Sequence, residues 1–273
     1  MTEKRKFYGM RNDYMFHAVL QKNEEVLRNL LATLLEMDEA DIVSCRIENP
    51  IELGREIKGK ECILDVKIIL NDARIINIEL QVYKQTYWVN RSLLYWSSAY
   101  DSIKSGQEYD RLLPTYHIGI LDFTLFNEHP KFMAQYQILD VEDHFLYSDK
   151  LCIKVLDLTQ IEKAKKQPGT DKKLLKWASI FKAETLEELE QLAGKEEVFE
   201  NMVLTLKKLS EDEKIRMQCE AREDYERCLL SEYSAGKREG IEQGTETTQK
   251  KLIHNLMESQ KITEDEARKM LGI

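Results

Sequence analysis

The pattern of apolar positions divides the first half of the chain into short helices and strands. Apolar side chains recur at helical spacing over residues 11–35, which predicts two helices, the second beginning at Asn23. Residues 42–47 alternate weakly and predict a short strand. Residues 85–106 return to helical spacing and end at a glycine, as helices commonly do. Asn12 and Asp13 are both candidates for the cap of the first helix.

The strongest strand signal is a β-hairpin. Two apolar runs, residues 62–70 and 75–82, flank a polar turn of Asn, Asp, Ala and Arg. Two further apolar runs, at residues 116–123 and 151–158, predict additional strands. Residues 128–137 lie between these runs and are expected to form a loop.

The chain from Asp171 onward carries helical patterns without a competing strand signal. Gly236, Gly240 and Gly244 follow one another at a spacing of four within a charged segment. This segment is expected to be a solvated helix, and self-association through it remains the open alternative. The pair Thr263 and Glu266 predicts a capping box that opens a short terminal helix.

The order of these elements predicts an α/β fold with a mixed sheet, followed by a helical extension. We expect a domain over residues 1–165, a helical subdomain over residues 166–230 and a charged helical tail over residues 231–273. The 273 residues are 42% hydrophobic and 33% charged, which suits this organisation.

Charge and composition exclude some classes of protein and leave others open. No run approaches the length of a membrane span and no apolar segment typical of a signal peptide is present, so a cytoplasmic protein without membrane contact is expected. The net charge is −9. Acidic side chains outnumber basic ones by more than two to one over residues 183–226, and the remainder is near neutral. Net charge therefore neither supports nor forbids a polyanionic substrate.

The five cysteines are odd in number, widely spaced and without a CxxC pair. This spacing argues against a disulfide framework or a structural zinc site, and free thiols are expected. A catalytic cysteine paired with a histidine would be an alternative, but no local signature supports it.

The charges inside the hairpin are its distinctive feature. Asp65 interrupts the first apolar run, and Glu79 and Gln81 interrupt the second. Because side chains alternate along a strand, Asp65 shares a face with Lys67, and Glu79 shares a face with Gln81. Each acid alone has an ordinary interpretation, as a buried residue satisfied locally or as a residue on a solvent face. Together, they predict a shared divalent cation, because burying unpaired carboxylates is costly and Mg²⁺ prefers oxygen ligands.

An acid, a short hairpin and then acid-x-Lys is the signature of the PD-(D/E)XK nuclease superfamily, which this hairpin resembles with Gln81 in the lysine position. Over roughly residues 8–230 the chain is also similar to the Rpn-like family of recombination-promoting nucleases and predicted transposases. Five ordered blocks carry this resemblance: Asn12-Asp13-Tyr14-Met15-Phe16, Leu64-Asp65-Val66-Lys67, Ile76-Asn77-Ile78-Glu79-Leu80-Gln81, Arg91-Ser92-Leu93-Leu94-Tyr95-Trp96 and Ile120-Leu121-Asp122-Phe123.

The resemblance implies an endonuclease that requires Mg²⁺ or Mn²⁺ and acts on DNA, with an αβββαβ core. Asp65 and Glu79 would ligate the metal, with the Leu80 carbonyl as a third ligand. Gln81 would orient the attacking water, but a glutamine supplies no positive charge and cannot act as a base. Lys67 is a candidate to restore that charge, with a surface lysine as the alternative.

Three further residues acquire roles from the same resemblance. Asp13 resembles an acid of the N-terminal helix that completes the metal site, and its alternative is a helix cap. Arg91 and Tyr95, four residues apart on one helix face, would contact DNA, and their alternative is ordinary core packing. Since Gln81 departs from the superfamily pattern, a weak or inactive module that binds nucleic acid or protein is the competing function. A helical scaffold assembled through the C-terminal segment is compatible with either.

Overall fold

The computed structural model of the chain describes residues 6–51, 53, 66–84, 86–101 and 106–273. The chain divides into two compact units, the first reaching Arg222 and the second running from Glu223 to Ile273. Each is described by itself. The sequence placed its divisions near residues 165 and 230.

Two helices open the first unit. Helix α1 spans Asp13–Lys22 and α2 spans Glu24–Leu35. The side chain of Asn12 accepts a hydrogen bond from the Met15 N–H and caps α1, and Asn23 does the same for α2 through the Val26 N–H. The predicted restart at Asn23 is therefore confirmed, and of the two candidate caps the first helix uses Asn12.

A six-stranded mixed sheet follows, in the order β1-β2-β3-β4-β6-β5. Its strands are β1 (Cys45–Ile47), β2 (Val66–Leu70), β3 (Arg74–Gln81), β4 (Thr115–Leu121), β5 (Met133–Leu139) and β6 (Leu146–Asp157). The pair β2–β3 is antiparallel, as a hairpin requires, whereas β3–β4 and β4–β6 are parallel. Helix α3 (Trp88–Tyr100) provides the connection between β3 and β4 that a parallel pair needs. The expected αβββαβ core is thus confirmed.

The prediction of a loop over residues 128–137 is wrong for its second half, because β5 begins at Met133. This strand pairs antiparallel with β6 at the edge of the sheet and is mostly exposed. Glutamines separate its apolar residues, so it lacks the continuous apolar run that marks a central strand.

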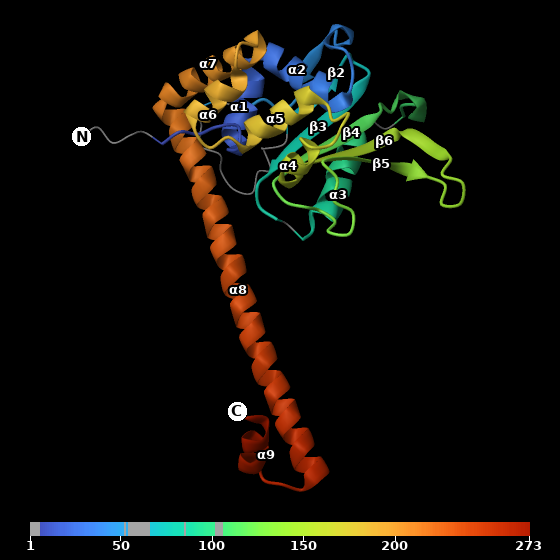
Figure 1. Cartoon of the computed structure of the whole chain (residues 1–273). Coiled ribbons are helices and arrows are strands. Elements are labelled where there is room, and N and C mark those ends of the chain that lie inside the picture. Colours follow the sequence, from blue (N-terminus) through green and yellow to red (C-terminus); the bar gives the residue numbers. More distant parts are fainter. Residues whose placement is uncertain (1–5, 52, 54–65, 85, 102–105) are drawn as a thin grey trace, which may run out of the picture. The chain divides into compact units, whose positions relative to one another are not determined.

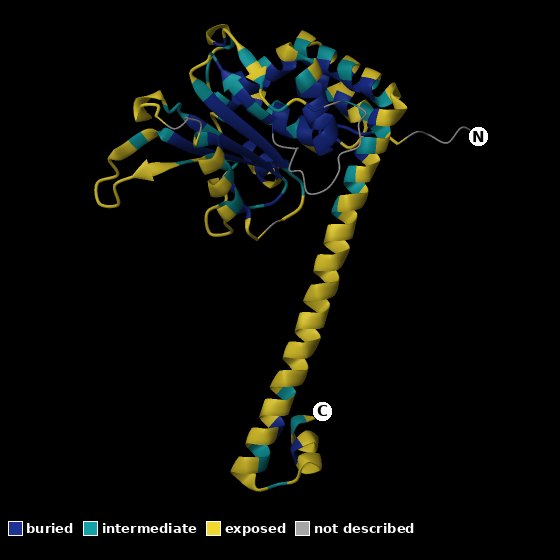
Figure 2. Ribbon diagram, turned by 180° about the vertical axis from the view of Figure 1, so that it is seen from behind, coloured by how far each residue is buried: buried dark blue, intermediate teal, exposed yellow. Residues whose placement is uncertain are grey.

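Different helices pack on the two faces of the sheet. Ile76, Ile78 and Leu80 of β3 belong to the main core, which α1, α2 and α5 (Lys172–Lys182) share. The opposite face packs on α3 and forms a second apolar cluster around Trp88. Figure 1 shows α3 on one side of the sheet and α1, α2 and α5 on the other, and Figure 2 shows the middle strands buried between them.

Four more α-helices complete the cover of the main core and lead to α8. They are α4 (Ile161–Ala164), α5 (Lys172–Lys182), α6 (Leu186–Ala193) and α7 (Glu197–Glu211). Single 3-10 turns occur at Glu39–Asp41, Tyr109–Arg111 and Leu158–Gln160. The ring of Trp177 is fully buried beside Phe181 and Phe199, and its N–H donates to the Asn29 side chain, which ties α5 to α2.

Helix α8 (Glu213–Gln260) begins in the first unit and continues into the second. Helix α9 (Glu264–Leu271) packs back on it, with Ile253 and Ala267 buried between them. The predicted capping box of Thr263 and Glu266 is present. Within the described residues, no helix is both long and apolar enough to cross a membrane, and the cysteines are free thiols. Cys62 lies outside the described residues.

Candidate active site

Glu79 is the central residue of the candidate site. It lies near the carboxyl end of β3, paired with Gly119 of β4, and only 2% of its surface is exposed. Apolar residues flank it along the strand because β3 is covered by neighbours on both edges and both faces. A carboxylate in such a place is stabilised only by charges or metal ions nearby.

Two basic side chains face the Glu79 carboxylate. Nη2 of Arg91 lies 3.0 Å from Oε1, and Nε2 of His117 lies 3.5 Å from Oε2. Neither carboxylate oxygen accepts a hydrogen bond of good geometry from a described residue. The arrangement neutralises the charge while leaving oxygen lone pairs of Glu79 available to a further ligand.

Helix α3 supplies Arg91 and places Tyr95 against it. The guanidinium carbon lies 4.9 Å from the centre of the Tyr95 ring, and that ring meets His117 edge-on at 6.2 Å. The helix lies close to the sheet because Trp88 packs directly over Gly119, where a side chain would overlap the indole ring. The predicted face of Arg91 and Tyr95 is therefore turned toward Glu79.

His117 is the main residue of the site that the sequence did not single out for it. It is fully buried on β4, and its Nδ1 lies 3.1 Å from Nδ2 of Asn77. An amide nitrogen can only donate, so Nδ1 is the acceptor of this contact, and Nε2 is the ring nitrogen that faces Glu79. The parallel register pairs Asn77 with His117. The sequence feature that could have identified His117 is a histidine within an apolar run of central-strand length.

The remaining hairpin residues occupy different positions around this centre. Lys67 pairs across β2 and β3 with Asn77, so it lies on the same face as Glu79 and is half-buried. Gln81 is half-exposed at the end of β3, and its carbonyl accepts the Asp122 N–H at 3.0 Å. The Leu80 side chain points to the opposite face, into the main core. Asp65, the first predicted ligand, lies outside the described residues.

Asp13 occupies the first turn of α1 and is buried. Its carboxylate accepts from Arg222 of α8, with Nη2 at 2.9 Å from Oδ2. Since Asn12 is the cap, the alternative interpretation of Asp13 as a cap does not hold. Asp13 instead anchors α8 to α1 within the first unit.

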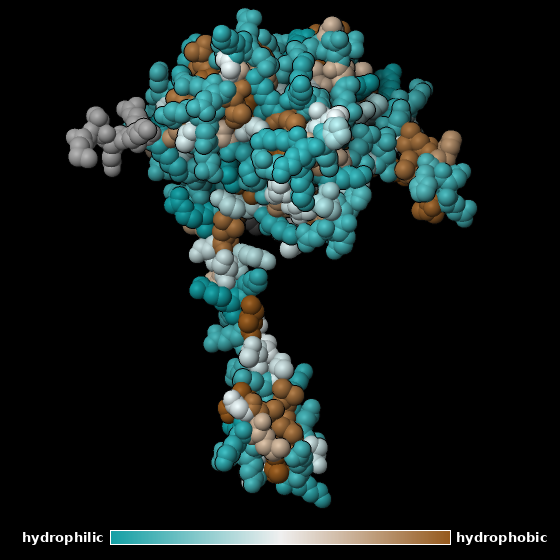
Figure 3. Space-filling view, viewed as in Figure 1, coloured by the Kyte–Doolittle hydropathy of each residue, from teal (hydrophilic) through white to brown (hydrophobic). Residues whose placement is uncertain are grey.

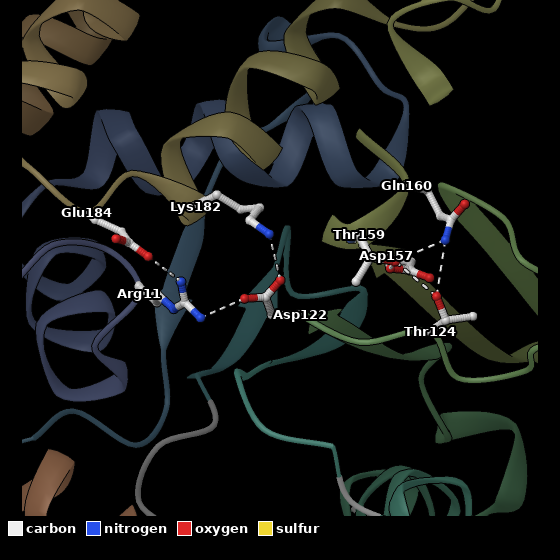
Figure 4. Close-up of polar contacts among 8 residues, drawn as sticks. All are labelled: Arg11, Asp122, Thr124, Asp157, Thr159, Gln160, Lys182 and Glu184. Atoms are coloured by element: carbon white, nitrogen blue, oxygen red, sulfur yellow. Dashed lines mark hydrogen bonds and ion pairs between the residues drawn. The ribbon is translucent and has the colours of Figure 1, made fainter. Parts of the chain in front are cut away.

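A second set of polar contacts fixes the carboxyl ends of β4 and β6 (Figure 4). Asp122, directly after β4, forms ion pairs with Arg11 at 2.8 Å and with Lys182 of α5 at 3.0 Å. Asp157, at the end of β6, accepts from the Thr159 hydroxyl at 2.6 Å. These contacts hold the end of the sheet beside Gln81.

Glu79 is the described residue best suited to bind a metal ion, because its two carboxylate oxygens are buried without a hydrogen bond of good geometry. Carboxylate oxygen is the ligand type that Mg²⁺ and Mn²⁺ prefer. Among the described residues, no three His, Cys, Asp or Glu side chains lie together as a complete metal site. A complete site therefore needs ligands beyond those side chains.

The fold and this buried acid define an α/β protein of the PD-(D/E)XK nuclease type. The family model described as PD-(D/E)XK nuclease family transposase matches residues 10–235, and the chain belongs to that family. No curated protein and no solved structure matches the chain.

Proposed function

We propose that this protein is a metal-dependent DNA endonuclease that hydrolyses phosphodiester bonds. The observation that carries the proposal is the buried Glu79 carboxylate, held at the end of a central strand with Arg91 and His117 facing it. Membership of a nuclease family supports the proposal that this carboxylate takes part in phosphodiester hydrolysis. Recombination, transposition and phage defence are the biological settings that we infer for such an activity.

We assign the metal to Asp65 and Glu79, with the Leu80 carbonyl as a third ligand. Support comes from the register of the hairpin, because Val66, which follows Asp65 in the sequence, pairs with Ile78, which precedes Glu79. We assign Asp13 only a supporting role as a metal ligand. To bind the cation, its carboxylate would have to give up its ion pair with Arg222. A bound Mg²⁺ or Mn²⁺ would supply activation of a water and charge stabilisation at the phosphoryl group.

The chain's own polar residues would position the other participants. The Gln81 amide, at the exposed end of β3, would orient the attacking water by hydrogen bonding. Lys67 lies on the face of Glu79 and would supply the positive charge that Gln81 lacks. His117 would hold the Glu79 carboxylate in place through its Nε2 proton.

Arg91 and Tyr95 would contact DNA. In the described structure Arg91 is the counter-charge of Glu79. A metal ion would take over that neutralising role and release the guanidinium for a phosphate oxygen, which it can bind bidentately. Tyr95, stacked beside Arg91, would support the guanidinium or a base.

A second function is supported by Gln81 and by the Arg91 ion pair, which neutralises Glu79 without metal. It is a module that retains the fold and binds nucleic acid or protein without cleaving. Calorimetric titration with Mn²⁺ separates the two functions. The endonuclease predicts heat of binding that disappears in Glu79→Gln. Intact DNA binding with no metal signal in the wild type would favour the module.

We also propose that the C-terminal helix contributes to self-association. Tyr233 and Ile241 are about 60% exposed beside the three spaced glycines of α8. The test is the mass of the chain without residues 236–273, measured by light scattering. An unchanged oligomeric state would count against this role.

A further inference from the structure

The end of the β5–β6 hairpin exposes large apolar side chains. Val141 is 91% exposed, Tyr147 81% and Phe145 73%, all within one short loop and the strand that follows it. Figure 1 shows the hairpin extending beyond the helices, and Figure 3 shows apolar and polar side chains together at its end. Exposed apolar groups gathered in this way are typical of a contact surface. We call residues 140–147 the hairpin tip.

The hairpin tip is acidic and well ordered. It contains Asp140, Glu142 and Asp143 but no lysine or arginine. The Asp140 carboxylate accepts from the Glu142 N–H at 2.8 Å and the Asp143 N–H at 3.3 Å, and these bonds lower the pKa of Asp140. The Asp140 N–H donates to the Phe145 carbonyl at 2.8 Å and closes the loop. Such order reduces the entropic cost of binding. The negative charge of the hairpin tip disfavours DNA as its binding partner.

A hollow of opposite character lies at the other end of β5. It has a volume of about 940 Å³ and is lined on its apolar side by Met37, Phe132, Met133 and Leu174. Lys131, Lys163 and Lys173 are its basic lining residues.

The acidic lining residues of this hollow are already engaged. Glu36 forms an ion pair with Lys154 at 2.8 Å, and Asp171 caps α5 through the Lys173 N–H. We call this site the lysine hollow. Its apolar floor and basic side chains are complementary to the hairpin tip in both hydrophobicity and charge.

The two features are related by β5 itself. The lysine hollow includes Phe132 and Met133 where β5 begins, and the hairpin tip follows Leu139 where β5 ends. The strand is seven residues long, so its two ends lie roughly 20 Å apart. Because β5 is one of the two edge strands of the described sheet, a two-fold axis near its centre exchanges one end for the other.

We propose that two copies of the chain dock reciprocally along this edge, each placing its hairpin tip in the lysine hollow of the other. A second copy satisfies both surfaces at once in a closed two-fold dimer, as self-complementary interfaces do. The edge strand, whose polar backbone groups invite further pairing, is then covered by its counterpart. This interface is separate from α8 and independent of the nuclease proposal.

The test is a charge exchange in the full-length chain, made with Tyr233→Glu on α8 in every protein so that association through that helix does not add to the measured mass. One variant carries Glu142→Lys and Asp143→Lys in the hairpin tip. The two hydrogen bonds to the Asp140 carboxylate remain, and the bond from the Phe145 N–H to the Asp143 carboxylate is lost. The other carries Lys131→Glu and Lys163→Glu in the lysine hollow. In each variant alone the two surfaces have like charge, so we expect light scattering to give the mass of a monomer. In an equal mixture both contacts are again between opposite charges, so we expect twice that mass, as for Tyr233→Glu without a charge exchange.

The control is Tyr233→Glu on α8, which we expect to leave this dimer intact. Circular dichroism of every variant checks that the fold is retained. A wild type that is monomeric at about 100 μM, the upper part of the micromolar range of weak complexes, overturns the proposal. The proposal is also overturned if each charge variant associates on its own, or if the mixture of the two variants stays monomeric.

Discussion

Glu79 illustrates how much a single buried carboxylate constrains its surroundings. Removing a carboxylate from water costs several kcal/mol unless neighbouring charges offset the loss, which here is the work of Arg91 and the Nε2 side of His117. Arg91 is half-buried and stacked on Tyr95, so its charge is held in place. Under the proposed function, a metal ion and Arg91 are alternative partners of the same carboxylate.

This competition predicts a split between metal binding and cleavage in Arg91→Met. Loss of the guanidinium destabilises the metal-free state more than the metal-bound state, so we expect Mn²⁺ to bind several-fold more tightly by calorimetry. Cleavage of DNA should fall at least tenfold at saturating metal, because the phosphate contact is lost. The matched control is the exposed Arg111→Met, which should change neither. Weaker metal binding in Arg91→Met would contradict the competition.

Cys152 predicts a pH-dependent property of the folded chain. Burial raises the pKa of its thiol from the ordinary 9.0 to about 11. At pH 8 we therefore expect iodoacetamide to label the exposed Cys228 readily and Cys152 slowly, as measured by mass spectrometry. The proton is bound more tightly in the folded state, so Cys152 contributes stability below pH 9 that is lost as the pH rises toward 11. Equal labelling of both thiols in the folded chain would disprove this.

Among the elements, α3 determines whether the site is assembled. It rests on β4 through Trp88 and Gly119, and this close approach brings Arg91 to Glu79. The glycine is needed because the indole ring occupies the space of a side chain.

Gly119→Ala should accordingly lower the free energy of unfolding by about 1–3 kcal/mol, the usual cost of overpacking a core. Urea denaturation measures it, and cleavage activity should fall as α3 moves away from the sheet. Gly236→Ala on α8 is the control, since nothing lies near that position and alanine favours a helix. A Gly119→Ala protein as stable as the wild type would show that α3 is less closely packed.

The elements also show what the sequence could and could not predict. The hairpin of β2 and β3 could be predicted because its two apolar runs are close in the sequence and the turn between them is polar. The face of Arg91 and Tyr95 followed from helical spacing. His117 meets Glu79 only through the register of two parallel strands, which joins distant segments and leaves no local pattern. The edge strand β5 was missed because its residues are mostly exposed.

At the scale of the whole molecule, family membership covers residues 10–235 and therefore the sheet, its covering helices and the first part of α8. The net charge of −9 means that DNA would be bound through local contacts near α3 rather than by a general attraction. The hairpin tip and the C-terminal helix are then available for contacts between copies of the chain.

The proposed role of Glu79 is in metal-dependent cleavage of DNA. The most direct measurement is conversion of supercoiled plasmid to nicked or linear product over a series of Mg²⁺ and Mn²⁺ concentrations. We expect cleavage by the wild type that requires metal, and a loss of at least a hundredfold in Glu79→Gln and Asp65→Asn. The exposed Glu128→Gln should cleave like the wild type. Undiminished cleavage by folded Glu79→Gln, or no cleavage by the wild type with any of these ions, would contradict it.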